Sequence, residues 1–260
     1  MIAEKKRKLR EEVLTRRDQI PESVRQEKST SICASLLRSF CALPKSKFFP
    51  HETVPTPHQI PESDSVIPEN VKAEKTLAGK TIAVYAAMKS EVNLEVFIQA
   101  AYAQGARICF PCITKGFRTS VSRETLMIFR EVSEEFYVKG AVPFINSPMR
   151  PFSSSDPIFQ NPSSMAPLKR IPSTTDEATP DAFLCDFPLV EPHEFDIVIV
   201  PLVAFDAENN RLGYGGGNYD QFLPLLRPDA HVVGVAFNEQ QVESVPVEPH
   251  DLPLPHIFSS

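Results

Sequence analysis

A glycine-rich segment between an arginine and an aspartate has the residue types of a phosphate-binding loop. The segment is Arg211-Leu-Gly-Tyr-Gly-Gly-Gly-Asn-Tyr-Asp220. Four of the protein's nine glycines lie within the five residues 213–217 of this segment. Glycine tolerates positive φ and lets the backbone approach a ligand closely, and successive N–H groups beside a helix N-terminus bind anions. Arg211 adds a fixed guanidinium at the entrance. The segment therefore predicts an anion site.

This loop differs from the two commonest phosphate motifs. A Walker loop ends in Gly-Lys-Ser/Thr, whereas this one ends Gly217-Asn-Tyr-Asp220, and a dinucleotide fingerprint has glycine where Asn218 stands. A connection that binds no ligand is the alternative. Three consecutive glycines between an arginine and an aspartate favour the binding loop.

Apolar runs on both sides of the loop predict the elements that position it. Residues 196–204 and 231–237 are expected strands, and residues 219–226 an expected short helix. Strand, loop, helix and strand form a βαβ unit with its loop at the carboxyl end of the first strand. Ligands bind at that edge of open α/β sheets.

A second βαβ unit is predicted upstream, with a strand at 80–87, a helix at 94–104 and a strand at 107–113. Its polar loop contains Glu91, which by itself would be a solvated charge. Cys109-Phe-Pro-Cys112 has the spacing of a redox or zinc motif, but it lies within a strand pattern and has no second pair. We interpret these cysteines as buried structural residues. Residues 126–132 are a further expected strand.

Two helices are predicted at the N-terminal end. Residues 3–18 form the first, and Lys6 and Arg10 share one of its faces. That face could be a solvated basic surface, an address signal or a phosphate contact. Pro21 begins the second helix. Its expected buried stripe consists of Val24, Ile32, Leu36, Leu37 and Phe40.

Composition narrows the class of protein. The 260 residues are 42% hydrophobic and have a net charge of −6, which argues against a globally basic nucleic-acid binder. No apolar run is long enough for a membrane span, and the first residues lack the apolar core of a secretory signal. Five cysteines are too few for a disulfide scaffold in a chain of this length. These features predict a cytoplasmic protein that does not bind membranes.

Proline marks two unusual segments. Sixteen of the 25 prolines lie in residues 44–68 and 143–192. We predict surface insertions or loops over 44–78 and 143–192, within a single domain spanning residues 1–260. The expected fold class is α/β with three layers, in which helices flank a mostly parallel sheet.

Residues 211–223 resemble the signature of the 5-formyltetrahydrofolate cyclo-ligase family, also called methenyltetrahydrofolate synthetases, and the likeness extends over most of the chain. Four other segments are similar to the family: Lys6-Arg-Lys-Leu-Arg10, Tyr85–Asn93, Val200–Asp206 and Glu248-Pro-His-Asp-Leu252. The resemblance implies ATP- and Mg²⁺-dependent cyclisation of 5-formyltetrahydrofolate to 5,10-methenyltetrahydrofolate, with release of ADP and phosphate. It implies that the formyl oxygen attacks the γ-phosphate and that N10 then closes the ring.

The resemblance also implies a set of site residues. The catalytic cations would be Lys6, Arg10 and Arg211, and the Mg²⁺ ligands Asp220 and Asp251. The ATP-binding residues would be Lys6, Arg7, Lys8, Leu9, Arg10, Arg211, Leu212, Gly213, Tyr214, Gly215, Gly216, Gly217, Asn218 and Tyr219. The substrate-binding residues would be Ala86, Glu91, Tyr214, Gly215, Gly216, Gly217 and Asn218, with Glu91 holding the pterin ring.

One position departs from the family, which usually has an aromatic residue where this chain has Asn218. Asparagine suits the start of a helix, but it cannot stack on a folate ring. The expected partners are small molecules only, and the expected state is a monomer.

Two other functions fit parts of the sequence. A regulatory module could have kept the phosphate loop and lost the reaction, although such a module would have no use for Glu91. A nucleic-acid binder could use the basic residues 5–17, although the acidic total and the lack of interleaved aromatic residues argue against it.

Overall fold

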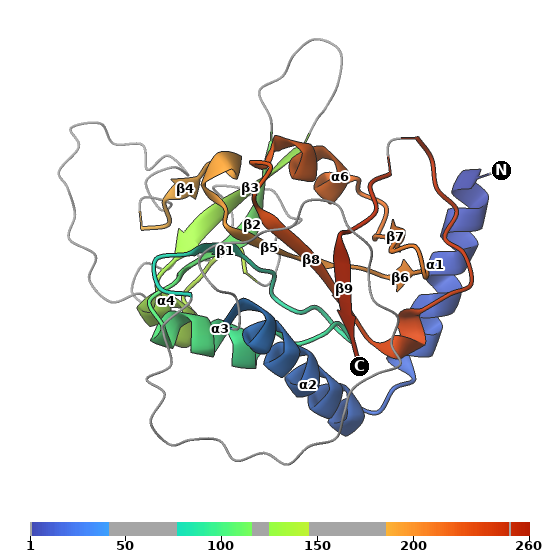
Figure 1. The fold of residues 1–260 in the computed structure, drawn as a ribbon, viewed down its shortest axis with the longest axis horizontal. Helices are drawn as coiled ribbons and strands as arrows, with labels where there is room; N and C mark the ends of the chain where they lie inside the picture. Colours follow the sequence, from blue (N-terminus) through green and yellow to red (C-terminus); the bar gives the residue numbers. More distant parts are fainter. Residues whose placement is uncertain (1, 42–76, 116–124, 146–185, 250) are drawn as a thin grey trace, which may run out of the picture.

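A seven-stranded sheet forms the centre of the molecule (Figure 1). The computed structural model describes residues 2–41, 77–115, 125–145, 186–249 and 251–260. The strand order is β4-β3-β2-β1-β5-β8-β9. The strands are β1 (Thr81–Ala83), β2 (Arg107–Lys115), β3 (Thr125–Val132), β4 (Leu189–Val190), β5 (Ile197–Pro201), β8 (His231–Ala236) and β9 (His256–Ser259).

Five neighbouring strands of this sheet run parallel: β2, β1, β5, β8 and β9. β3 pairs antiparallel with β2, and β4 pairs antiparallel with β3. The two predicted βαβ units are confirmed, because β1 pairs with β2 and β5 pairs with β8, each pair parallel and joined through a helix. The predicted fold class, a mostly parallel sheet flanked by helices, is confirmed.

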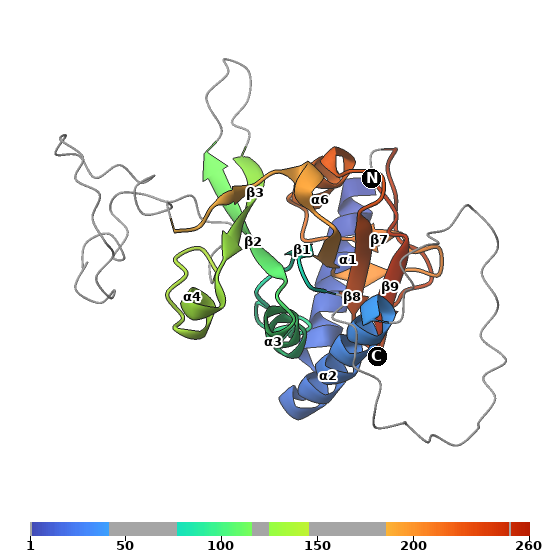
Figure 2. The ribbon, with the colours of Figure 1, turned by 60° about the vertical axis from the view of Figure 1, so that its left-hand side comes forward.

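Helices cover both faces of the sheet (Figures 1 and 2). The helices are α1 (Ile2–Asp18), α2 (Glu22–Cys41), α3 (Glu95–Ala103), α4 (Glu134–Val138) and α6 (Asn218–Phe222). Neighbouring strand residues alternate between two hydrophobic clusters. Ile82 and Ile199 join the cluster that contains α2 and α3, and Ala83 and Val198 join the one that contains α6. This period of two is what buries both faces of the strands.

Some boundaries differ from the predictions. The strand expected at 80–87 has regular pairing only over Thr81–Ala83, although the Val84 N–H still donates to the Cys109 carbonyl at 2.9 Å. The helix expected at 219–226 is split into α6 and the 3₁₀ turn Leu223–Leu225, because Pro224 has no N–H to continue an α-helix. Val24 was expected in the buried stripe of α2, and this was wrong, since it is 37% exposed.

The structure also contains a hairpin that the sequence patterns did not indicate. Strands β6 (Ala204–Phe205) and β7 (Arg211–Leu212) pair antiparallel between β5 and the glycine loop. They are too short for periodicity to reveal. The hairpin brings Arg211 and Leu212 into a buried position at the start of the loop.

Most of the two proline-rich segments lies outside the described residues, which omit 42–76 and 146–185. The described ends of the second segment belong to the core. Phe144 and Phe187 are buried, and their ring centroids are 5.3 Å apart. No helix in the described part of the chain is long and apolar enough to cross a membrane.

Candidate active site

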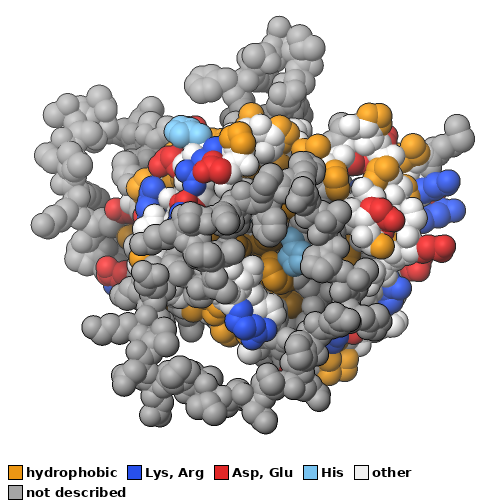
Figure 3. Space-filling model, in the orientation of Figure 1, with side chains coloured by type: hydrophobic (Ala, Val, Ile, Leu, Met, Phe, Trp, Pro, Cys, Tyr) orange, Lys and Arg blue, Asp and Glu red, His pale blue; other side chains and the backbone are white. Residues whose placement is uncertain are grey.

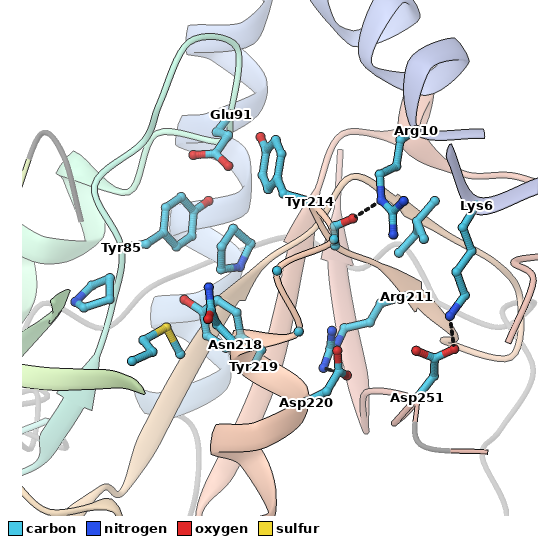
Figure 4. Close-up of a pocket in the computed structure, with 18 of the residues that line it drawn as sticks. Lys6, Arg10, Tyr85, Glu91, Arg211, Tyr214, Asn218, Tyr219, Asp220 and Asp251 are labelled. Carbon is cyan, nitrogen blue, oxygen red and sulfur yellow. Dashed lines mark hydrogen bonds and ion pairs between the residues drawn. The ribbon is translucent and has the colours of Figure 1, made fainter. Parts of the chain in front are cut away.

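A cavity of about 400 Å³ opens beside the glycine loop, next to the carboxyl ends of β1 and β5 (Figure 4). The residues around it come from α1, from the loop after β1, from β2 and β3, and from the segment before β9. Elements far apart in the sequence therefore share one site. This is the edge of the sheet at which the sequence predicted a ligand.

The backbone conformation of the glycine loop would be strained for residues other than glycine. Gly215 has φ of +99° and Gly217 has φ of +65°, and Gly217 immediately precedes α6. A Cβ on Gly215 would lie only 3.3 Å from Cζ of Arg10. At Gly215 both the torsion angle and the close approach of Arg10 require glycine.

Three predicted cations meet at the loop end of the cavity, and each has a partner (Figure 4). The Lys6 ammonium donates to Asp251 Oδ2 at 2.5 Å and to Glu248 Oε2 at 2.8 Å. Arg10 Nε donates to the Gly213 carbonyl at 2.7 Å. Arg211, whose side chain is 5% exposed, donates from Nη2 to Asp220 Oδ1 at 2.6 Å. At the loop end, the charges of Lys6 and Arg211 are therefore paired with carboxylates, whereas Arg10 is held by a neutral carbonyl.

These surroundings move the pKa values of two of the cations in opposite directions. Burial disfavours charged Lys6, but the hydrogen bonds and charges of Asp251 and Glu248 outweigh burial and raise its pKa. Burial lowers the pKa of Arg10, against a smaller opposing effect of the Asp251 charge. A lysine with this partner set stays protonated at neutral pH and is available to an anionic ligand.

The basic segment at the start of the chain contributes only part of what the resemblance implied. Arg7 and Lys8 face solvent beside Glu4, and Arg7 also pairs with Glu11 at 3.2 Å. Leu9 packs against the small hydrophobic cluster under α1 instead of entering the cavity. Successive helical residues are about 100° apart, so Lys6 and Arg10, about one turn apart, share the cavity face, whereas Arg7 and Lys8 between them point elsewhere.

The opposite end of the cavity is mainly apolar and contains one buried carboxylate. Ala86, Met88, Pro111 and Met127 line it. Glu91 is 7% exposed, and its Oε2 accepts from the Met88 N–H at 2.8 Å. Burial raises the pKa of Glu91, while hydrogen bonds from Met88 and Tyr214 and the charge of Arg17 act in the opposite sense.

The residues expected to bind ATP over 212–219 all border the cavity, between these two ends. Tyr214 reaches from the glycine loop toward Glu91, and Asn218 lies near Tyr85 and Tyr219 (Figure 4). The Tyr85 hydroxyl donates its proton to the Val92 carbonyl at 2.8 Å, so this proton is already engaged within the protein.

Two charged residues of the site were missed. Glu248 shares Lys6 with Asp251, and Arg17 is buried behind the cavity. The sequence could have indicated Arg17. It lies on one face of α1 with Lys6, Arg10 and Val13, because these four residues are separated by four, three and four positions along the helix. For Glu248 no periodic pattern existed, because residues 246–249 have no regular secondary structure.

The carboxylates near Lys6 have the donor type that Mg²⁺ prefers. Among the described residues, no three side chains of His, Cys, Asp or Glu are grouped closely enough to hold a metal by themselves. Mg²⁺ usually binds one or two carboxylates and completes its octahedron with water and phosphate oxygens. Asp220 and Asp251 both border the cavity and are carboxylates of this type, and both lie below Arg211 in Figure 4.

The cysteine pair is structural, as interpreted from the sequence. Cys109 and Cys112 are buried and lie in different hydrophobic clusters, on opposite faces of the sheet. Burial raises the pKa of the Cys112 thiol to about 11. Neither side chain is placed to act together with the other.

Comparison with known proteins supports the resemblance. Residues 172–260 match the model of the 5-formyltetrahydrofolate cyclo-ligase family. Proteins named 5-formyltetrahydrofolate cyclo-ligase are 49% identical over 63 residues in Haemophilus influenzae and 46% identical over 65 residues in Escherichia coli. These matches cover 24% and 25% of this chain, and 34% and 36% of the two relatives. The matched region therefore spans about a third of each relative's length.

The fold comparison covers much more of the chain. A 5,10-methenyltetrahydrofolate synthetase from Mycoplasma pneumoniae aligns with 97% of this chain and 97% of its own, at a TM-score of 0.55 and 19% identity. The enzyme of that name from Aquifex aeolicus aligns with 98% of this chain and 89% of its own, at a TM-score of 0.52 and 19% identity. At this identity the alignments show a shared fold. With the family match over residues 172–260, the resemblance predicted from the sequence is confirmed.

Proposed function

We propose that this chain, which resembles the 5-formyltetrahydrofolate cyclo-ligases, catalyses the ATP-dependent closure of 5-formyltetrahydrofolate to 5,10-methenyltetrahydrofolate, with release of ADP and phosphate. One observation carries the proposal. A single cavity has three cations and a glycine loop at one end and a buried carboxylate among apolar side chains at the other. A triphosphate and a pterin ring need these two environments side by side.

The loop end suits the triphosphate. Arg10, Lys6 and Arg211 would supply positive charge, and the backbone around Gly215 leaves room for phosphate oxygens. Phosphate binding requires an exchange, because Lys6 must give up part of its contact with Asp251 and Glu248. Mg²⁺, when bound by Asp220 and Asp251, would neutralise phosphate charge at this end.

The apolar end suits the pterin. A carboxylate accepts two N–H bonds from the aminopyrimidinone edge of the ring, and Glu91 is a carboxylate held by its own loop. Tyr85, Met88 and Pro111 offer flat or apolar surfaces to the ring. Asn218 contributes a polar contact at the position where the family usually has an aromatic side chain.

Little covalent chemistry would fall to the protein. The formyl oxygen would attack the γ-phosphate, N10 would attack the activated carbon, and phosphate would leave as the ring closes. The chain would contribute alignment of the two substrates and stabilisation of charge on the transferred phosphoryl group. Lys6, Arg10 and Arg211 are the residues placed for that second role.

The decisive test is the absorbance of methenyltetrahydrofolate formed from 5-formyltetrahydrofolate, ATP and Mg²⁺. We expect ATP-dependent turnover by the unmodified chain and a large loss in Lys6→Gln. Lys28→Gln is the matched control, because Lys28 pairs with Glu239 at 3.1 Å and does not border the cavity. No ATP-dependent turnover by the unmodified chain would refute the proposal.

Calorimetric titration with ATP and with 5-formyltetrahydrofolate separately tests the regulatory alternative, in which nucleotide binds without reaction. ATP binding without folate binding would favour that alternative. A nucleic-acid role for α1 has little support from its surface, because Arg7 and Lys8 are paired with Glu4. A cytoplasmic monomer that acts on small molecules remains our expectation.

A further inference from the structure

Arg17 is buried behind the cavity and does not border it. The residue is 1% exposed and lies at the end of α1. Its Nε donates to Ser90 Oγ at 2.9 Å, and its Nη2 donates to the Tyr214 hydroxyl at 2.9 Å. One guanidinium therefore joins the loop after β1 to the glycine loop.

The hydrogen bonds around Arg17 have a fixed direction. A guanidinium can only donate, so the hydroxyls of Ser90 and Tyr214 must accept from it. Each hydroxyl then has its own proton for a further partner. Ser90 donates to the Asp18 carboxylate, and the Tyr214 hydroxyl points toward the Glu91 carboxylate (Figure 4).

Tyr214 is consequently a bridge between the two ends of the cavity. Its backbone lies between Gly213 and Gly215 in the proposed phosphate loop, and its hydroxyl points toward Glu91, the residue proposed to hold the pterin ring (Figure 4). Arg10 holds the carbonyl of Gly213, and Arg17 holds the side chain of Tyr214. Two arginines about two turns apart on one face of α1 thus fix both the backbone and the side chain of this loop position.

The burial of Arg17 is a further sign of function. Burying a guanidinium is unfavourable unless it is compensated, and Nη1 of Arg17 has no hydrogen-bond partner among the described residues. The guanidinium carbon also lies 5.8 Å from the centroid of the Tyr214 ring. These contacts hold the end of the Tyr214 side chain, although the residue as a whole is 47% exposed and borders the cavity.

We propose that Arg17 is a positioning residue that couples nucleotide binding at the glycine loop to substrate binding at Glu91, through the Tyr214 hydroxyl. The inference rests on the proposed function and adds a property to it. A ligand that orders the glycine loop also orders Tyr214. Tyr214 in turn fixes the orientation of the Glu91 carboxylate oxygens that accept hydrogen bonds. By linkage, each ligand then raises the affinity for the other by the same factor.

Calorimetric titration measures this coupling directly. The affinity for 5-formyltetrahydrofolate is measured with and without a saturating non-hydrolysable ATP analogue, and the reverse titration checks reciprocity. We expect the analogue to increase affinity about five-fold or more in the unmodified chain. In Arg17→Gln and in Tyr214→Phe, each ligand still binds alone, but the increase falls below about two-fold. The double variant shows no further loss, because both changes interrupt the same connection.

The control is Arg16→Gln, which removes a guanidinium from the same helix. Arg16 donates to the Gln241 carbonyl at 3.2 Å and borders a separate surface hollow. Its coupling should equal that of the unmodified chain. If Arg17→Gln does not fold, Tyr214→Phe still decides the question, since it removes one hydroxyl and keeps the ring.

The outcomes separate the two proposals. If both ligands bind and the coupling persists in Tyr214→Phe and Arg17→Gln, the role of Arg17 is refuted and the proposed function stands. If both ligands bind the unmodified chain with no coupling, the same conclusion holds. If neither ligand binds the unmodified chain, the proposed function is refuted, and this inference with it.

Discussion

The two ends of the cavity hold charge in different ways. At the glycine loop, Lys6 and Arg211 are paired with carboxylates at 2.8 Å or less. At the other end, Glu91 is buried among apolar side chains, and its hydrogen bonds come from neutral donors on Met88 and Tyr214. A paired charge can exchange its protein partner for a ligand. A buried carboxylate with unused acceptor positions has lost hydrogen bonds to water, and a ligand that donates hydrogen bonds replaces them.

This difference would let one site select the two unlike groups of the proposed function. Phosphate would compete with the carboxylates for the cations, so its binding should be sensitive to charge at every position of the loop end. A pterin would add hydrogen bonds to Glu91 without displacing an ion pair. Variants at the loop end should therefore affect stability and nucleotide affinity together, whereas variants at Glu91 should affect only substrate affinity.

The largest effect is expected from Arg211→Met. It leaves Asp220 without its partner beside the cavity, and breaking such a pair costs about 3 kcal/mol of unfolding free energy. Nucleotide affinity should fall as well. Denaturant unfolding and ATP titration measure the two effects separately.

A double variant, Arg211→Met with Asp220→Leu, distinguishes these effects further. Replacing both charges with apolar groups should restore most of the stability, because no unpaired charge remains. Nucleotide affinity should stay low. A double variant that recovers ATP binding would show that Arg211 contributes to the fold alone.

Glu91→Gln should have the next largest effect. The amide offers one acceptor and an unwanted donor, so substrate affinity should fall by about 1.5–3 kcal/mol while nucleotide affinity is kept. Stability at neutral pH should not fall, because burial raises the pKa of Glu91 and its ionised form is costly in the folded state. Glu135→Gln, at an exposed pair with Lys139, is the control. Unchanged folate affinity in Glu91→Gln would remove Glu91 from the site.

Gly215→Ala should have a smaller effect on stability, about 1–2 kcal/mol, because alanine is strained at φ of +99°. The new methyl group also presses on the Arg10 guanidinium, so ATP affinity should fall beyond what the stability change explains. Gly213→Ala is the matched control, since a Cβ there meets nothing within 4 Å and φ is not positive. Equal ATP affinities in the two variants would contradict a binding role for Gly215. Melting curves and calorimetry supply the measurements.

The smallest effect is expected from pH. Glu91 must be ionised to accept two hydrogen bonds, and its pKa is raised by burial. Substrate affinity should therefore weaken as pH falls through that raised pKa, at a higher pH than for an exposed glutamate. The free energy of unfolding should depend on pH in the opposite direction. A carboxyl with a raised pKa contributes stability at low pH, and this stability is lost as pH rises. Titrations of the unmodified chain and Glu91→Gln between pH 5 and about 8 test this, and the variant should lack the dependence.

Most of the fold was predictable because its signals are local. The apolar runs of β5 and β8 follow from periodicity, and the structure confirms them. The hairpin of β6 and β7 was not predicted, because strands of two residues have no measurable period. Pairing across the sheet defines them, and pairing is a property of the folded chain.

The glycine loop and the Lys6–Arg10 spacing were determined by the sequence alone. Backbone freedom at glycine and the 3.6-residue turn of a helix are properties of a few neighbouring residues. Only the tertiary structure decided that Glu248 shares Lys6 with Asp251, and that Arg17 meets Tyr214. The Lys6 partners lie more than 240 residues away and the Arg17 partner 197, and no local preference connects residues so distant. Packing of α1 against the carboxyl edge of the sheet brings them together, so the charge pattern of this site exists only in the folded molecule.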